Sequence, residues 1–164
     1  MGLSGVGGLG VALLLATGCA VMDFQRLAPG RSTEADVRRA LGEPAMVLPA
    51  ADGSRQLAFP TGPFGTQTWM AYVSADGRLL RLEQALTDDN LQRVSRGISQ
   101  DEVLRLIGPP WRRVDFANKR QVAWDYRFQD TWGYLVDYAV MVDERGIVAE
   151  TVRVRIDKEQ GDSR

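Results

Sequence analysis

The sequence of 164 residues contains no histidine and a single cysteine. Histidine is the commonest general base near neutral pH and the commonest metal ligand, so most hydrolytic and metal-dependent chemistry lacks its usual residues here. One cysteine can form no disulfide within the chain and no thiolate cluster for zinc. Carboxylate or Ser/Lys chemistry stays open on composition alone. We expect no metal, no cofactor, no small-molecule substrate and no enzymatic activity.

The chain also has no excess of charge of one sign, since 20 Lys and Arg residues face 21 Asp and Glu residues. Nucleic-acid-binding domains are strongly basic, so we expect no nucleic acid as a partner. Neighbouring carboxylates occur at residues 88–89, 101–102 and 143–144. Such pairs can act as acid and base, but the starts of two helices and a turn explain all three, because negative charge is favourable at a helix N-terminus.

The first 18 residues carry no charge and centre on an apolar run at residues 9–16. That run is shorter than the roughly 20 apolar residues that span a bilayer, but it suits the core of a signal peptide. Three small residues directly precede Cys19, an arrangement that resembles the lipobox of bacterial lipoproteins. In a lipobox the cysteine accepts the lipid because a thiolate is a nucleophile. We expect residues 1–18 to be removed and Cys19 to be the lipid attachment site.

The segment around Cys19 also allows another interpretation. Ala16 stands where leucine is commoner in a lipobox, and no Lys or Arg precedes the apolar run. A freely secreted protein, cleaved after Gly18 with Cys19 left over, is the alternative. Ala20, rather than aspartate, follows the cysteine, which in lipoproteins of this kind resembles the default outer-membrane address. The expected location is the outer membrane, with a periplasm-facing lipid anchor and a short tether at residues 19–25.

The remainder of the chain is an internal repeat. Residues 33–44 match residues 99–110 at a constant offset of 66, and residues 55–59 match residues 120–124 at an offset of 65. A self-match of this kind indicates a duplicated structural unit.

Each copy begins with a short helix that is marked at both ends. Thr33 and Ser99 are N-cap residues, and an acidic residue three positions later can complete a capping box. Gly42 and Gly108 can end the helix in the left-handed conformation, and a proline two residues later prevents its return. A weaker helical segment precedes each of these helices. The weaker segments are residues 24–27 and 88–95.

Strands are predicted after each helix, because apolar and polar residues alternate there. In the last of them, Val152, Val154 and Ile156 share one face, and Arg153 and Arg155 share the other. Each unit is expected to be helix, helix and a three-stranded antiparallel meander. The expected strands are residues 56–59, 66–74 and 78–86 in the first copy, and residues 122–128, 136–142 and 148–156 in the second.

The predicted fold class is therefore α+β, built from two tandem helix-helix-β-β-β units with the helices on one face of each sheet. The first unit is expected at residues 26–87, the second at residues 88–157, and a flexible tail at residues 158–164. A unit of about 65 residues is marginal alone, since small domains bury a low fraction of their surface. No linker rich in Gly, Pro or Ser separates the two, so we expect them to pack together.

The second copy resembles the SmpA/OmlA (BamE-like) family of outer-membrane lipoproteins. The resemblance lies in residues 97–103, in residues 107–110, in the strand at residues 124–128 and in Gly146. The first copy matches through residues 33–44 and departs from the family at the Pro- and Gly-rich residues 60–65. Family members usually carry one such unit, and the doubling is similar to the secreted β-lactamase inhibitor proteins. Those inhibitors carry disulfides, which this chain cannot form.

Several aromatic and basic residues are candidates for contact with a partner. Trp69 and Trp124 fall within predicted strands, and we expect them in the core. Others fall in predicted loops, where they can bind a partner or cover the edge of the core. Basic residues beside Trp111 can meet anionic lipid headgroups or an acidic partner, or form a solvated loop. The candidate partner contacts are Phe64, Trp111, Trp132, Tyr134, Arg112 and Arg113.

The family resemblance implies a non-catalytic envelope lipoprotein. Its partners would be the membrane, through the N-terminal lipid, and other envelope proteins, including the β-barrel assembly machinery. Its function would be outer-membrane protein assembly or envelope integrity. The alternative is a two-unit proteinaceous inhibitor that inserts a loop into a periplasmic hydrolase. Fold resemblance alone does not decide between them.

Overall fold

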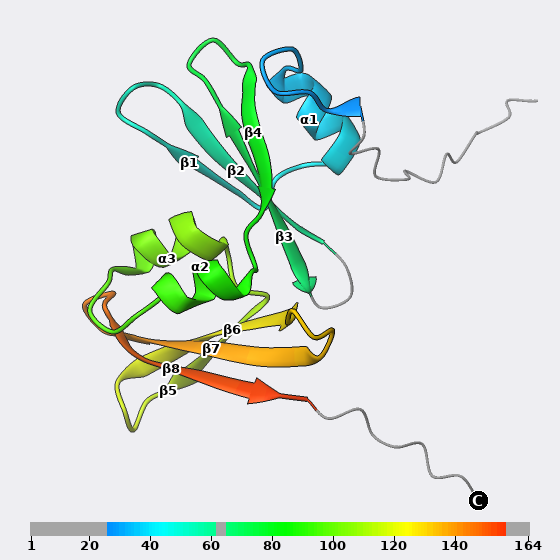
Figure 1. Ribbon diagram of the computed structural model, residues 1–164. Helices are drawn as coiled ribbons and strands as arrows, with labels where there is room; N and C mark the ends of the chain where they lie inside the picture. Colours follow the sequence, from blue (N-terminus) through cyan, green and yellow to red (C-terminus); the bar gives the residue numbers. More distant parts are fainter. Residues whose placement is uncertain (1–25, 62–64, 157–164) are drawn as a thin grey trace, which may run out of the picture.

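The computed structural model describes residues 26–61 and 65–156, which form two helix-and-sheet units in chain order (Figure 1). Each unit contains one four-stranded antiparallel sheet, with strand order β1-β2-β3-β4 in sheet 1 and β5-β6-β7-β8 in sheet 2. The first unit consists of α1 (Glu34–Leu41), β1 (Met46–Pro49), β2 (Arg55–Thr61), β3 (Gln67–Val73) and β4 (Leu79–Gln84). The second consists of α2 (Asp88–Arg93), α3 (Gln100–Ile107), β5 (Arg112–Phe116), β6 (Gln121–Gln129), β7 (Leu135–Asp143) and β8 (Val148–Arg155).

Helices α1 and α3 have the capping boxes that the sequence predicts. The Asp36 amide donates to Thr33 Oγ1 at 3.3 Å, and the Thr33 amide donates to the Asp36 carboxylate at 2.9 Å. Ser99 and Glu102 repeat the arrangement at 3.2 and 2.9 Å. A glycine with positive φ follows each helix, but its ψ of −161° at Gly42 and −170° at Gly108 is extended, unlike the left-handed conformation that the sequence predicts. The duplicated motif therefore gives two equivalent helices.

Each sheet has one strand more than the sequence predicts. β1 and β5 pair with β2 and β6 at one edge of their sheets. Both edge strands are short, and β5 consists largely of charged residues, so their sequences lack the apolar alternation by which strands are recognised. The described part of the first unit contains one α-helix, and the second unit contains two. Half of the predicted segment 24–27 lies outside the described residues, and residues 26 and 27 are not part of an α-helix.

Helix α1 covers one face of sheet 1. Val37 and Leu41 of α1 are buried against Leu57 and Phe59 of β2. The opposite face of the same sheet carries Ala58 and Met70, which are also fully buried. Strand β2 is consequently buried along nearly its whole length, as expected of a strand that is covered on both faces.

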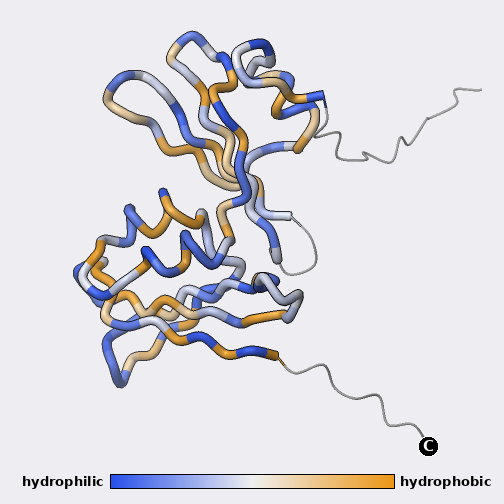
Figure 2. The backbone as a smooth tube through the Cα atoms, viewed as in Figure 1, coloured by the Kyte–Doolittle hydropathy of each residue, from blue (hydrophilic) through white to orange (hydrophobic). Residues whose placement is uncertain are grey.

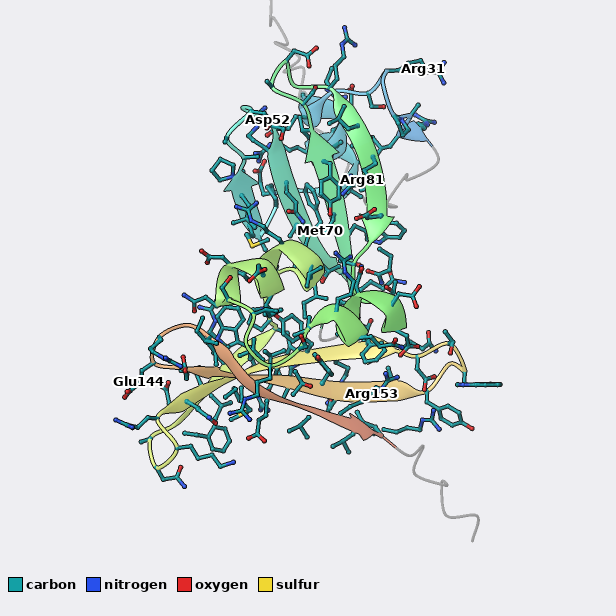
Figure 3. All side chains as sticks on the ribbon, turned by 60° about the vertical axis from the view of Figure 1, so that its left-hand side comes forward. Arg31, Asp52, Met70, Arg81, Glu144 and Arg153 are labelled. Carbon is teal, nitrogen blue, oxygen red and sulfur yellow. The ribbon has the colours of Figure 1, made fainter. Side chains whose placement is uncertain are left out.

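Helix α3 lies between the two sheets and joins the units (Figures 1 and 3). Val103 and Ile107 of α3 enter the core of sheet 2. On the other side of the helix, Gln56 Nε2 donates to the Arg105 carbonyl oxygen at 2.7 Å. A Cβ atom on Gly108 would lie 2.8 Å from Thr68 Cγ2 and 3.1 Å from Met70 Cε. The two units are thus in direct contact through this helix.

Sheet 2 has two unlike faces. Its inner face packs on α2 and α3 through a core that includes Trp124, Tyr126, Phe128 and Val140. No described element covers the other face, which we call the outer face. No helix among the described residues is long and apolar enough to cross a membrane.

Candidate functional site

The tip of the β6–β7 hairpin (residues 129–135, the hairpin tip) carries the most exposed large hydrophobic side chain in the described part of the chain. Trp132 is 80% exposed, and Tyr134 and Leu135 beside it are also exposed. The Arg155 guanidinium carbon lies 4.4 Å from the centre of the Tyr134 ring, a distance at which a cation attracts an aromatic face. The sequence predicts Trp132 and Tyr134 as candidate contacts, and the structure places them together.

A buried carboxylate holds the hairpin tip in one conformation. Asp130 Oδ1 accepts hydrogen bonds from the backbone amides of Trp132 at 3.0 Å and Tyr134 at 2.9 Å. Asp130 Oδ2 accepts from Arg155 Nη2 at 2.7 Å, and only 1% of the Asp130 side chain is exposed. Gly133 supplies the positive φ that the turn requires. Trp132 is therefore exposed on a rigid loop rather than on a loose one.

Hydrogen bonds stabilise the charged form of Asp130 at the hairpin tip. Burial raises the pKa of Asp130, and hydrogen bonds from the Tyr134 amide, the Arg155 side chain and the Trp132 amide lower it. The lowering is the larger effect, so the pKa lies below its usual value. Three donors favour the charged form of a carboxylate. The braced form of the hairpin tip therefore persists at neutral pH.

Arginines on the inner face of β8 connect the hairpin tip to α2. Arg153 Nη2 lies 2.7 Å from Asp88 Oδ1, at the start of α2; Arg153 is labelled in Figure 3. The Thr131 amide donates to the other oxygen of Asp88 at 3.3 Å. Asp88 and Asp130 are thus committed to arginine and backbone partners rather than to an acid–base pair.

A groove with a volume of about 680 Å³ lies beside the hairpin tip. Sheet 1 contributes one wall through Gln67 and Gln84, the start of α2 contributes Thr87 and Asp88, and most of the remaining lining comes from the β6–β7 hairpin. Amide, hydroxyl and carboxylate groups line the groove together with Leu86, Leu135 and Ile156, so the groove suits the mixed surface of a protein segment. Its lining is Thr66, Gln67, Gln84, Leu86, Thr87, Asp88, Arg127, Gln129, Asp130, Thr131, Gly133, Leu135 and Ile156.

Trp111 lies where the two units meet. It is 39% exposed, and a Cβ atom on Gly65 of the first unit would lie 3.7 Å from Trp111 Cβ. The Arg127 guanidinium carbon lies 6.0 Å from the centre of a Trp111 ring, and Arg127 also lines the groove. Trp111 is thus near the groove but is partly used in covering the junction between the units.

A loop is one interpretation of the basic residues after Trp111 from the sequence. In the structure these residues form edge strand β5 and the turn that follows it. Arg112 and Arg113 point to opposite faces of sheet 2 because neighbouring residues in a strand alternate. Arg112 Nη2 lies 2.7 Å from Asp125 Oδ2 on the outer face, whereas the Arg113 guanidinium covers Trp124 at 4.5 Å. Lys119 and Arg120 pair with Glu150 and Glu144. This stretch therefore offers no concentrated positive patch to lipid headgroups.

Cys19 and Phe64 lie outside the described residues. Trp124 is buried in the core of sheet 2, as predicted, and Trp69 packs partly buried against the core of sheet 1. Among the described residues, no group of His, Cys, Asp and Glu side chains could hold a metal ion. The neighbouring carboxylates at 88–89 and 101–102 occupy first turns of helices, and those at 143–144 lie at a turn, as predicted.

Sequence reasoning missed the most important residue of the hairpin tip, Asp130. A signal for it was present, because an aspartate that starts a turn commonly accepts hydrogen bonds from amides two or more residues later. The partner Arg155 could not be found in this way, since 25 residues separate it from Asp130.

No model of a known protein family matches the chain, and no curated protein matches it. Among solved structures, the chain is similar to a DUF4309 family protein, YjgB, from Bacillus subtilis subsp. subtilis. The two sequences are 14% identical, the match covers 81% of this chain and 84% of that chain, and the TM-score is 0.31. A likeness at this level gives no basis for assigning a function.

Proposed function

We propose that this chain is a non-catalytic, lipid-anchored protein of the bacterial envelope that binds another envelope protein through the hairpin tip and the adjoining groove. The observation that carries the proposal is the exposure of Trp132 on a loop that the buried Asp130 carboxylate braces. Binding hot spots are enriched in tryptophan and tyrosine. An exposed aromatic side chain on a rigid loop binds with little loss of conformational entropy.

The membrane part of the proposal depends on Cys19 and on the apolar segment before it. A lipid on Cys19 would hold the folded units close to the bilayer, because the tether of residues 19–25 spans at most about 25 Å when extended. The proposed membrane is the outer membrane, on its periplasmic side. Two anchored components of one membrane meet at a higher effective concentration than two free proteins, which favours weak partners.

The proposed partner is a component of the β-barrel assembly machinery, and the proposed role is outer-membrane protein assembly or envelope integrity. Two features support this choice: the capped helix with its Gly-x-Pro end, which both units share, and the antiparallel meander that follows it. The SmpA/OmlA-like, BamE-like arrangement of each unit is part of the proposal.

Photo-cross-linking in intact cells tests the site and the partner together. A photoreactive phenylalanine analogue replaces Trp132 in the full lipidated chain, and the same analogue at Leu80 is the matched control, because Leu80 is also exposed but lies on β4 of sheet 1. We expect a cross-link to an outer-membrane assembly component from position 132 and none from position 80. Equal cross-linking from both positions, or none from either, would contradict the proposal.

An inhibitor of a periplasmic hydrolase is the second candidate, because a braced hairpin with an aromatic tip can also enter the cleft of an enzyme. The same cross-linking experiment separates the two, since a soluble hydrolase would then be captured at position 132. A Cys19→Ser variant gives an independent check. An inhibitor retains its binding without the lipid, whereas a membrane-tethered assembly factor loses its effect on outer-membrane proteins.

A further inference from the structure

Strand β8 is an edge of sheet 2 whose outward backbone groups are unpaired along most of its length. It pairs with β7 on one side, and the described part of the chain places no strand on the other. The Ile156 amide donates to the Leu135 carbonyl oxygen at 2.8 Å. Hydrogen-bonded pairs alternate along an antiparallel ladder, so the backbone groups of Val152 and Val154 face β7. Those of Thr151, Arg153 and Arg155 face away from it.

The apolar side chains of β8 point away from the core. A bulge between Val148 and Glu150 inverts the alternation, so that Val148 is buried while Val152 and Val154 lie on the outer face at 44% and 56% exposure. Hydrophobic and hydrophilic residues alternate along this strand in Figure 2. A long edge strand with exposed apolar side chains is a template for pairing with another strand.

The charges of β8 do not oppose such pairing. Arg153 and Arg155 point to the inner face, where Asp88 and Asp130 neutralise them at 2.7 Å each. Glu150 on the outer face pairs with Lys119. The exposed part of the strand therefore offers valines on one face and neutralised arginines on the other.

The sequence of β8 is complementary to itself about Val152. In an antiparallel pair centred on this residue, Val152 lies opposite Val152 of a second copy, Thr151 lies opposite Arg153, and no like charges meet. Centring on Arg153 would oppose two arginines, which is unfavourable. A pair centred on Thr151 would require Val148 to pair with the second copy. The Val148 amide and carbonyl groups are already hydrogen-bonded to Ile98 and Gly97, at 2.9 Å each.

We propose that two copies of this chain associate through antiparallel pairing of their β8 strands, with the two-fold axis at Val152, to form one continuous eight-stranded sheet. The outward groups of Thr151 and Arg153 make the hydrogen bonds of this pair, so the two Val152 residues form a non-hydrogen-bonded pair with Cα atoms about 4.5 Å apart. The proposal depends on β8 alone and is independent of the proposed envelope function.

Disulfide trapping tests the register directly, because the chain has a single cysteine. In full-length chain carrying Cys19→Ser, we introduce Val152→Cys and compare it with Val154→Cys, which is on the same face and is more exposed. Two cysteines at position 152 would be within disulfide range. Two at position 154 would be about 14 Å apart, since four residues of strand separate them. Under mild oxidation, Val152→Cys is expected to form a covalent dimer at least about tenfold faster, because pairing raises the effective thiol concentration.

A third variant separates strand pairing from random collision. Adding Thr151→Pro to Val152→Cys removes an outward N–H group without removing a bond to β7, and edge strands accept proline at such positions. Its cross-linking rate should fall to that of Val154→Cys, with circular dichroism and thermal melting confirming that the variants are folded. Equal rates for Val152→Cys and Val154→Cys, or a faster rate for Val154→Cys, would overturn the proposal.

Discussion

Two tryptophans of the second unit show how the same side chain serves two purposes. Trp124 is buried between β6 and the helices, with the Arg113 guanidinium covering its ring. Trp132 is almost fully exposed at the hairpin tip. Burial of an aromatic ring stabilises a small core, whereas exposure of one on a rigid loop provides a contact for a partner. We therefore expect Trp124 to contribute to stability and Trp132 to contribute to partner binding.

Replacing Trp132 by alanine should weaken partner binding without affecting folding. We expect a loss of about 2 kcal/mol in binding, or roughly thirtyfold in Kd. The free energy of unfolding should change by less than about 0.5 kcal/mol. Trp124→Ala is the contrasting variant and should lose about 3–5 kcal/mol of stability. Denaturant unfolding and a binding titration with the captured partner measure both effects; unchanged affinity in Trp132→Ala would remove the hairpin tip from the binding site.

The capping box of α1 makes a contribution to the stability of the protein that depends on pH in the acid range. Hydrogen bonds from the Thr33 amide and hydroxyl, with a further one from Arg39, lower the pKa of Asp36 from 3.8 to about 2. Because the folded-state pKa is depressed, the stabilisation is complete above the unfolded pKa and is lost as the pH falls from about 4 to about 2.

The stability difference between wild type and Asp36→Asn should therefore be constant above pH 5 and shrink steadily as the pH falls toward 2. Thermal unfolding followed by circular dichroism at a series of pH values measures it. Asp101→Asn is the control, since Asp101 also lies in a first turn but is not the capping-box residue of α3. A difference that persists unchanged to pH 2 would contradict the assignment.

At the scale of elements, three hairpins of this fold share one turn design. In the turns at residues 130–134 and 143–147, the first aspartate accepts hydrogen bonds from amides two and four residues later. The fourth residue is a glycine with positive φ in both. Ser74 and Gly77 occupy the same positions in the β3–β4 turn. A side-chain acceptor and a glycine at fixed spacing thus set the β3–β4 turn of the first unit and the β6–β7 and β7–β8 turns of the second.

The shared design supplies a matched pair for testing the brace in the hairpin tip. Asp130→Ala should increase amide hydrogen exchange at Trp132 and Tyr134 and weaken partner binding, because the loop loses its single conformation. Asp143→Ala should increase exchange at Arg145 and Ile147 to a similar extent and leave binding unchanged. Exchange followed by NMR distinguishes them; equal losses of binding in the two variants would show that the brace has no special role.

At the scale of the whole molecule, the contact between the units depends on the end of α3. Gly42 and Gly108 end equivalent helices with similar φ values of 86° and 80°. A Cβ atom at Gly42 would meet nothing within 4 Å, whereas one at Gly108 would press on Thr68 and Met70 of sheet 1. The same substitution therefore measures backbone strain alone at one site, and strain plus packing between the units at the other.

Gly42→Ala should cost about 1–3 kcal/mol, because a residue with a side chain is strained at the φ of 86° and ψ of −161° that Gly42 adopts. Gly108→Ala should cost a further 1–3 kcal/mol or so, since overpacking forces neighbouring groups to move. Denaturant unfolding of the two variants gives the difference. If both lose the same stability, the two units do not press on each other at this helix end.

The sequence by itself determined the elements that depend on local interactions. The two capped helices, the glycines that end them, most of the strands and the duplication are encoded in residues a few positions apart, where capping and alternation act. Trp132 could also be identified as a loop residue, since the turn signals around it are local. The short edge strands β1 and β5 escaped, because β1 has only four residues and charged residues make up most of β5.

Tertiary structure alone decided which faces are covered. The alternation of β8 separates its valines from its arginines. The valines face outward only because of the bulge after Val148 and because Asp88 and Asp130 form ion pairs with Arg153 and Arg155 on the inner face. The brace of the hairpin tip and the contact of α3 with sheet 1 likewise join residues that are distant in sequence. Interactions of this kind depend on how the chain folds back on itself, and the pattern along the chain does not encode that locally.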